Sequence, residues 1–192
     1  RRERPDGTPE VDMNDCLKSS LRMRPDRIIV GEVRGPECAT LLTAMNTGHD
    51  GSFGSLHANT AQETVTRMIN PPMNVPPIML SGLDLIIIQA RLHVNGKTAR
   101  KITEVAEVAG MEGDKPRLNA IWKYNAAKDQ IEETGIPSKL RETICSAAGV
   151  TPDVFERHVS QRQAIIEDLC SRGISDIQTV TSVIQNFYAQ QH

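Results

Sequence analysis

The spacing of hydrophobic positions predicts a helix followed by a strand near the start of the chain. Residues 10–26 form the predicted helix, with Asp12 as its N-cap and Pro25 preventing its continuation. Its apolar positions share one stripe, which consists of Met13, Leu17 and Leu21. Residues 27–31, RIIVG, show no polar alternation. That pattern is typical of a strand buried on both faces of a parallel sheet.

The same alternation of helix and strand continues over the next segments. Residues 36–48 predict a second helix, and residues 51–57, GSFGSLH, predict a short strand. Thr60 and Glu63 have the spacing of a capping box, so we expect a third helix to begin there and to end before Pro71. Helices and strands in this order predict an α/β fold.

The pattern then changes to antiparallel strands. Residues 83–94 and 97–108 flank Asn95-Gly96, which is the strongest short signal for a hairpin. Shorter strands are predicted at residues 117–125 and 130–135.

The C-terminal part of the chain reads as helical from Pro137 onward. Thr151 and Pro152 suit the start of a long amphipathic helix, and Gly173 suits its end. We therefore expect a mixed core domain at residues 1–135 and a helical subdomain at residues 136–192.

Composition narrows the classes of function. The 192 residues are 39% hydrophobic and 24% charged, which suits one medium domain with a small appendage. A net charge of −2 and an aromatic content of 3% argue against a nucleic-acid partner. Four widely separated cysteines form no CxxC pair, which argues against a zinc site and a disulfide framework. The chain does not begin with methionine, and we expect it to be a piece of a longer protein.

Two residues that could carry chemistry follow successive predicted strands. Glu32 lies directly after the first strand, and His57 ends the second. In a parallel sheet, ligands bind at the carboxyl ends of strands, and an acid there can hold a metal and orient water for phosphoryl transfer. The alternatives are that Glu32 forms only a salt bridge with Arg34, and that a backbone group satisfies His57.

Residues 21–67, from LRMRPD to TAQETVTR, resemble the second half of the nucleotide-binding domain of the type II/type IV secretion ATPase superfamily. This superfamily includes the motors of Tad-type and archaeal pili and of the archaellum. RIIVGEVRG resembles its Walker B strand, and GSLHANTAQET resembles its histidine box. The segment after residue 83 resembles its closing β-hairpin, and the C-terminal tail is similar in kind to archaeal members. The resemblance implies an α/β, RecA-like P-loop NTPase core, present in part, with a β-hairpin region and a C-terminal helical tail.

The resemblance also implies roles for the two strand-end residues and their neighbours. Glu32 would act on the attacking water and on the magnesium ion of bound ATP, contacting the metal through water. His57 would sense the γ-phosphate. Gly31 would let the backbone pass close by, and Arg34 would anchor the loop or pair with the acid.

Four further residues are carried over from family motifs. Arg22 and Arg24 match arginines near the nucleotide or the subunit interface, and the alternative is that they are solvated charges. Glu3 and Arg4 lie where the family has its acidic-arginine box, although the segment here is shorter than the usual pattern.

The implied activity is that of a hexameric motor ATPase that uses ATP and Mg²⁺ for pilus or archaellum assembly, or for protein secretion. The resemblance implies a homo-hexamer that works with a polytopic membrane platform protein, in the cytoplasm at the membrane. The chain has no GxxxxGK[ST] sequence, so we expect this loop upstream and no ATP hydrolysis by the chain alone. One alternative is a non-enzymatic ring-interaction or regulatory module. Another is a nucleic-acid-translocating RecA-like motor, which the charge and the histidine box disfavour.

Overall fold

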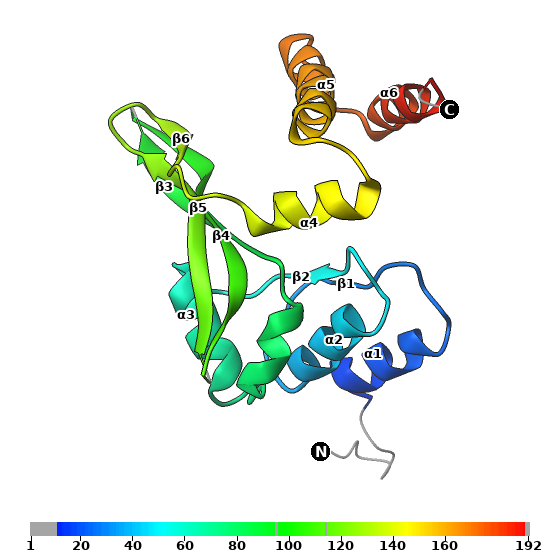
Figure 1. Ribbon diagram of the computed structural model, residues 1–192, viewed down its shortest axis with the longest axis vertical. Coiled ribbons are helices and arrows are strands. Elements are labelled where there is room, and N and C mark those ends of the chain that lie inside the picture. Colours follow the sequence, from blue (N-terminus) through cyan, green and yellow to red (C-terminus); the bar gives the residue numbers. More distant parts are fainter. Residues whose placement is uncertain (1–10, 95, 114, 191–192) are drawn as a thin grey trace. The chain divides into compact units, whose positions relative to one another are not determined.

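The computed structural model describes residues 11–94, 96–113 and 115–190 (Figure 1). Contacts divide the chain into two compact units, Arg1–Lys139 and Leu140–His192. The interpretation of residues 1–135 and 136–192 as an ATPase part and a helical subdomain stays a prediction. The described elements of the first unit are α1 (Met13–Leu21), β1 (Ile29–Val30), α2 (Glu37–Asn46), β2 (Phe53–Gly54), α3 (Ala61–Ile69), η1 (Pro77–Gly82), β3 (Leu85–Val94), β4 (Lys97–Glu112), β5 (Lys115–Asn125) and β6 (Gln130–Glu133).

Strands β1 and β2 pair in parallel and are joined through α2, which confirms the predicted α/β winding at this point. Ile29 lies opposite Phe53 in the register. The prediction that the first strand is buried on both faces is wrong, because Ile29 is 64% exposed while Ile28 and Val30 are buried. Successive side chains of a strand point to opposite faces, so only alternate residues reach the core in this two-stranded sheet.

Helix α1 begins where the sequence predicts. Asp12 accepts a hydrogen bond from Asp15 N, and the Asp15 side chain returns a bond to the Asp12 backbone, completing a capping box. The helix ends at Leu21, before Pro25. Leu17 is buried, but Met13 is half exposed, so the predicted stripe contacts the core only in part.

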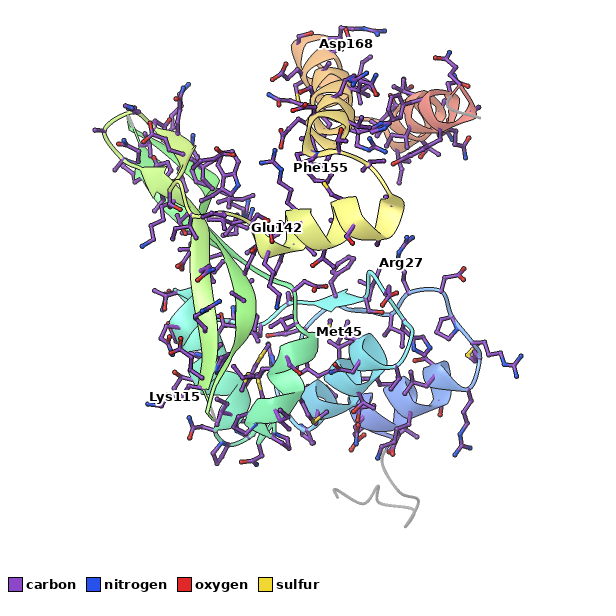
Figure 2. The ribbon with its side chains drawn as sticks, in the orientation of Figure 1. Arg27, Met45, Lys115, Glu142, Phe155 and Asp168 are labelled. Carbon is purple, nitrogen blue, oxygen red and sulfur yellow. The ribbon has the colours of Figure 1, made fainter. Side chains whose placement is uncertain are left out.

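The second sheet is antiparallel, with strand order β3-β4-β5-β6. Val94 pairs with Lys97, which confirms the hairpin predicted from the sequence. Strand β4 runs on to Glu112, beyond its predicted end, and Figure 2 shows Lys115 at the turn between β4 and β5. Helix α3 packs on β3, β4 and β5.

The hydrophobic core of the first unit lies among α1, α2, α3, η1 and the two sheets. Leu42 of α2 and Leu80 of η1 are almost completely buried. Met45 of α2 packs against this core with its side chain partly buried (Figure 2). Fully burying one such aliphatic side chain stabilises a fold by about 1.5–3 kcal/mol. The core therefore fixes β1 and α2, between which the Glu32 segment lies.

The second unit is helical, which confirms the prediction for the C-terminal part. It contains most of α4 (Lys139–Ala148), α5 (Pro152–Ser171) and α6 (Ile177–Ala189). Gly173, with a φ of 64°, follows α5 as predicted. Among the described residues of this unit, only Cys145 and Leu169 are buried apolar side chains. In the described part of the chain, no helix is both long enough and apolar enough to cross a membrane.

Candidate active site

The two residues that follow β1 and β2 meet at one edge of the parallel sheet, as predicted. We call residues 31–36 the Glu32 loop and residues 55–60 the His57 loop. Glu32 Oε1 lies 3.0 Å from His57 Nε2. The His57 side chain is 83% exposed, so this histidine is not a core residue satisfied by a buried backbone group. The geometry brings an acid and an imidazole to the same solvent-facing position.

Arg34 completes the cluster. Its Nε lies 2.6 Å from Glu32 Oε1, in a salt bridge at the surface. The hydrogen bond from the Arg34 guanidinium is the largest cause that lowers the pKa of Glu32; desolvation, the next in size, raises it, and His57 lowers it by less than either. In return, Glu32 raises the pKa of Arg34. Glu32 is therefore a carboxylate at neutral pH and binds a proton more weakly than an ordinary glutamate.

Ser55 fixes the backbone on both sides of Glu32. Its N–H donates to Val30 O at 3.2 Å, and its carbonyl accepts from Val33 N at 2.7 Å. Its hydroxyl donates to Gly31 O at 2.6 Å. These three bonds continue the pairing of β1 and β2 past the last strand residue, so the Glu32 backbone is held to the neighbouring strand.

A buried carboxylate holds the rest of the Glu32 loop. Glu37, the first residue of α2, is 7% exposed, and its Oε1 accepts from Arg34 N at 2.7 Å and Gly35 N at 2.9 Å. A carboxylate at a helix N-terminus also interacts favourably with the helix dipole. The next residue, Cys38, is buried, and burial, with a smaller contribution from the Glu37 charge, raises the pKa of its thiol to about 11. The sequence analysis identified neither Ser55 nor Glu37 as a site residue.

A partly exposed carboxylate, that of Glu63, holds the His57 loop. Thr60 is the N-cap of α3 and accepts from Glu63 N, as predicted. The other half of the predicted capping box is wrong, because the Glu63 side chain accepts from Asn59 N at 2.9 Å and Asn59 Nδ2 at 3.0 Å. Arg67 binds the second oxygen of Glu63, at 2.8 Å from Nε and 2.7 Å from Nη2. The Asn59 backbone bond and the Arg67 bond lower the pKa of Glu63.

The cluster fits a magnesium–nucleotide complex in one respect that the structure itself shows. Glu32 Oε1 is shielded from solvent by its contacts with Arg34 and His57. Within the described residues no ion pair or hydrogen bond involves Glu32 Oε2, so this second oxygen can accept a bond from water. In the described part of the chain no three His, Cys, Asp or Glu side chains form a metal-binding group. One carboxylate with retained water matches how Mg²⁺ binds beside substrate phosphates, rather than in an all-protein cage.

A small pocket adjoins the cluster. Its volume is about 290 Å³, and Arg34 and His57 form part of its wall. The remaining lining residues come from the Glu32 loop and from α3 and the segment after it: Val33, Arg67, Pro71, Pro72 and Met73. The pocket offers space for a ligand group directly beside the exposed imidazole.

The other predicted site residues are less directly connected. Arg22 and Arg24 are exposed, and within the described residues no ion pair joins either of them to Glu32 or His57. Glu3 and Arg4 lie outside the described residues. At Gly31, a Cβ would meet no protein atom within 4 Å, so packing within the chain does not require this glycine. Gly54 is different, because a Cβ there would lie 2.9 Å from the Leu41 side chain.

Comparison with known proteins places these motifs in a family. Residues 4–183 match the family model described as Type II/IV secretion system protein. A probable conjugal transfer protein TrbB of Sinorhizobium fredii is 53% identical over 130 residues, which cover 64% of this chain and 36% of that protein. The type IV pilus assembly ATPase PilB of Pseudomonas aeruginosa is 41% identical over 83 residues, covering 43% of this chain and 14% of PilB.

A solved structure is similar as well. The VirB11 ATPase from the Brucella suis type IV secretion system, in complex with sulphate, is 30% identical, with a TM-score of 0.42. The similarity covers 50% of this chain and 32% of that one. The chain spans 60% of the length of the first curated relative that it matches, and 35% and 19% of the next two. Because the family model covers most of its residues, the chain belongs to the type II/type IV secretion ATPase family.

Proposed function

We propose that this chain supplies the Walker B and histidine-box half of a motor ATPase, with Glu32 and His57 as its catalytic residues. The observation that carries the proposal is the 3.0 Å approach of these two side chains at one edge of a parallel sheet, in a chain of this family. The carboxyl edge of a parallel sheet is where ligands bind in α/β folds.

The role of Glu32 follows from its charge and its position. With its pKa lowered by Arg34, Glu32 stays ionised and is suited to orient water rather than to store a proton. Arg34 and His57 both contact Oε1, so Oε2 is the oxygen that would accept a bond from that water. A magnesium ion bound with ATP would supply charge neutralisation at the phosphates. Arg34 positions Glu32 by pairing with its Oε1, and this pairing does not block the second carboxylate oxygen.

His57 is positioned to contact a bound ligand. Its ring is largely exposed, with Nε2 towards Glu32, so its other face and its loop are accessible from the adjoining pocket. A nitrogen of an exposed imidazole can donate a hydrogen bond to a phosphate oxygen. A shift of His57 towards the γ-phosphate would change its contact with Glu32, which links the ligand to loop position.

The wider assembly is part of the same proposal. We infer a homo-hexamer that binds ATP and Mg²⁺, acts with a polytopic membrane platform protein, and works in the cytoplasm at the membrane. The named relatives act in conjugal transfer and pilus assembly, which supports export of protein or assembly of a pilus or archaellum as the work performed. The phosphate-binding loop GxxxxGK[ST] is not in these 192 residues, so the proposal requires it from another segment.

That missing loop favours one second candidate, a non-enzymatic module that binds or regulates a ring of such ATPases. Such a module would use the same surfaces without turnover. It predicts no ATP hydrolysis by any form of the natural protein that contains this chain.

The test is Glu32→Gln in the natural protein, with ATP binding and steady-state hydrolysis measured on the same samples. We expect nearly unchanged binding and a loss of turnover of about 100-fold or more, because the amide matches the shape but not the charge of the carboxylate. Glu112→Gln, at an exposed position of β4, is the matched control and should hydrolyse ATP normally. Turnover of Glu32→Gln near that of the control would make Glu32 a structural partner of Arg34. A natural protein that neither binds nor hydrolyses ATP would establish the non-enzymatic module instead.

A further inference from the structure

A third carboxylate reaches the end of the His57 loop from the antiparallel sheet. Glu104 lies on β4, and its Oε2 accepts a hydrogen bond from Ala61 N at 3.0 Å. Ala61 is the first residue of α3 and is 1% exposed. Its N–H is one of the donors that a helix leaves unpaired at its N-terminus. Within the described residues, the Thr60 hydroxyl is bonded to Glu63 N, so the cap does not serve Ala61 N.

A second glutamate of β4, Glu107, binds residues at the start of α4. Glu107 is 2% exposed, and its Oε2 accepts from Lys139 N at 2.8 Å. Its Oε1 accepts from the Ser138 hydroxyl. Lys139 also donates from Nζ to Ala109 O at 3.2 Å. Ser138 and Lys139 are therefore held to β4 at the point where α4 begins.

Strand β4 is regular and paired on both edges between these two contacts. Strand β4 is paired on one side with β3 and on the other with β5. The extra residues of β4 are Thr103 and Ala109, which lie outside the segment from Glu104 to Glu107, and the shift between Val105 and Ala106 places its extra residue on β5. Side chains of β4 therefore alternate regularly from Glu104 to Glu107. Residues three apart on a strand point to opposite faces, so Glu104 and Glu107 serve elements on different sides of the sheet.

We propose that β4 connects the His57 loop to the start of α4, with Glu104 as a positioning residue for His57. The Glu104 bond fixes the first turn of α3, and the His57 loop ends at that turn. A displacement of His57 therefore displaces β4 at Glu104. Glu107 transmits this displacement to Ser138 and Lys139. The connection is a property of the fold, while its use during ATP hydrolysis rests on the proposed function.

Amide hydrogen exchange tests the connection without any need for turnover. In Glu104→Ala, we expect exchange at residues 59–63 to rise by about fivefold to tenfold, normalised to the core amides of β3. Glu104→Gln keeps an acceptor oxygen and should restore most of the protection. Glu112→Ala, on the same strand, should leave these amides unchanged. Exchange in Glu104→Ala within twofold of the unaltered protein would overturn the positioning role.

The longer connection needs a variant at Glu107. Glu107→Ala removes both acceptor oxygens, so the bonds from Lys139 N and from the Ser138 hydroxyl are lost. We expect faster exchange both at residues 138–145 and at residues 59–63. Faster exchange at residues 138–145 alone would contradict transmission along β4.

Kinetics then separate this proposal from the proposed function. In an ATP-hydrolysing protein, Glu104→Ala should lower kcat several-fold and leave KM for ATP unchanged, because Glu104 acts through His57 and does not touch the nucleotide. Loss of kcat without a change in exchange at residues 59–63 would overturn positioning by Glu104. If exchange rises as expected in the variants but the unaltered natural protein shows no measurable turnover, the connection along β4 is supported and the proposed function is rejected.

Discussion

The two loops that meet at the sheet edge are held by the same chemistry in different surroundings. In each, a glutamate of the following helix accepts bonds from backbone N–H groups of the loop. Glu37 is buried, and Ser55, the first residue of the His57 loop, adds three bonds around Glu32. Glu63 is only partly buried, with its side chain 30% exposed, and it forms an ion pair with Arg67. The Glu32 loop is therefore anchored in the core at Val33 and Gly35, while the part of the His57 loop after Ser55 depends more on surface interactions that water and salt weaken.

This difference suits the two proposed roles. A carboxylate that orients water must stay within a few tenths of an ångström of its productive position. A histidine that senses a phosphate has to move when the ligand changes. The comparison therefore predicts that changes around Glu32 cost stability, while changes around His57 cost mainly loop order.

The largest contrast should appear between the reactivities of two cysteines, the buried Cys38 near the start of α2 and the exposed Cys16. The pKa of about 11 and the burial of Cys38 predict alkylation at pH 8 at least about 100-fold slower than at Cys16. Mass spectrometry after timed maleimide labelling measures both rates in one sample. Equal rates at Cys16 and Cys38 would show that the helix after the Glu32 loop is not held in the core.

Glu37→Ala should be the most destabilising change among the residues that hold the two loops. It leaves Arg34 N and Gly35 N without an acceptor, at a cost of about 2–3 kcal/mol in the free energy of unfolding. Urea unfolding followed by Trp122 fluorescence measures this loss. Glu112→Ala, at an exposed position, should change the free energy by no more than about 0.5 kcal/mol. A loss in Glu37→Ala no larger than in this control would contradict the buried role of Glu37.

Ser55→Ala should have a smaller effect. It removes the hydroxyl bond to Gly31 O and keeps the two main-chain bonds, so we expect a loss of about 0.5–1.5 kcal/mol. Ser55→Thr retains the hydroxyl and serves as the matched control in the same urea titration. If both variants unfold at the same urea concentration, the hydroxyl does not hold the Glu32 backbone.

Glu63→Gln should have the smallest effect on stability, and the effect should depend on pH. The pKa of Glu63 is lowered from its ordinary 4.5 in the folded protein. A lowered pKa gives stability that is present above the unfolded value and is lost as the pH falls through the folded value. The difference in thermal midpoint between the unaltered protein and Glu63→Gln should therefore shrink from pH 6 to below pH 4, and also in 1 M salt. A difference in thermal midpoint that grows as the pH falls would contradict a pKa of Glu63 lowered by the Asn59 and Arg67 contacts.

The sequence predicted those features that depend on local pattern. Asp12 and Thr60 as caps, the hairpin at Asn95-Gly96 and the helices after Pro137 all follow from residues close together in the chain. The meeting of Glu32 and His57 was also predictable, because parallel strands end at a common edge.

The remaining features depend on contacts between distant residues. Ser55 binds Gly31 from 24 residues away, and Glu104 binds Ala61 from 43 residues away, so no local spacing could indicate either bond. The exposure of Ile29 was missed because an apolar run does not reveal how many layers cover a strand. Glu37 did carry a signal, since an acid in the first turn after a loop commonly binds the N–H groups before its helix.

The central claim is that Glu32 and His57 act as one unit in hydrolysis. A kinetic double-mutant cycle on the natural protein tests it most directly, with Glu32→Gln, His57→Ala and the double variant assayed for kcat. If Glu32→Gln lowers kcat by about 100-fold and His57→Ala by about tenfold, the account predicts a double variant about as slow as Glu32→Gln alone. A double variant slowed by the product, about 1000-fold, would show that the two residues act independently and would contradict the account.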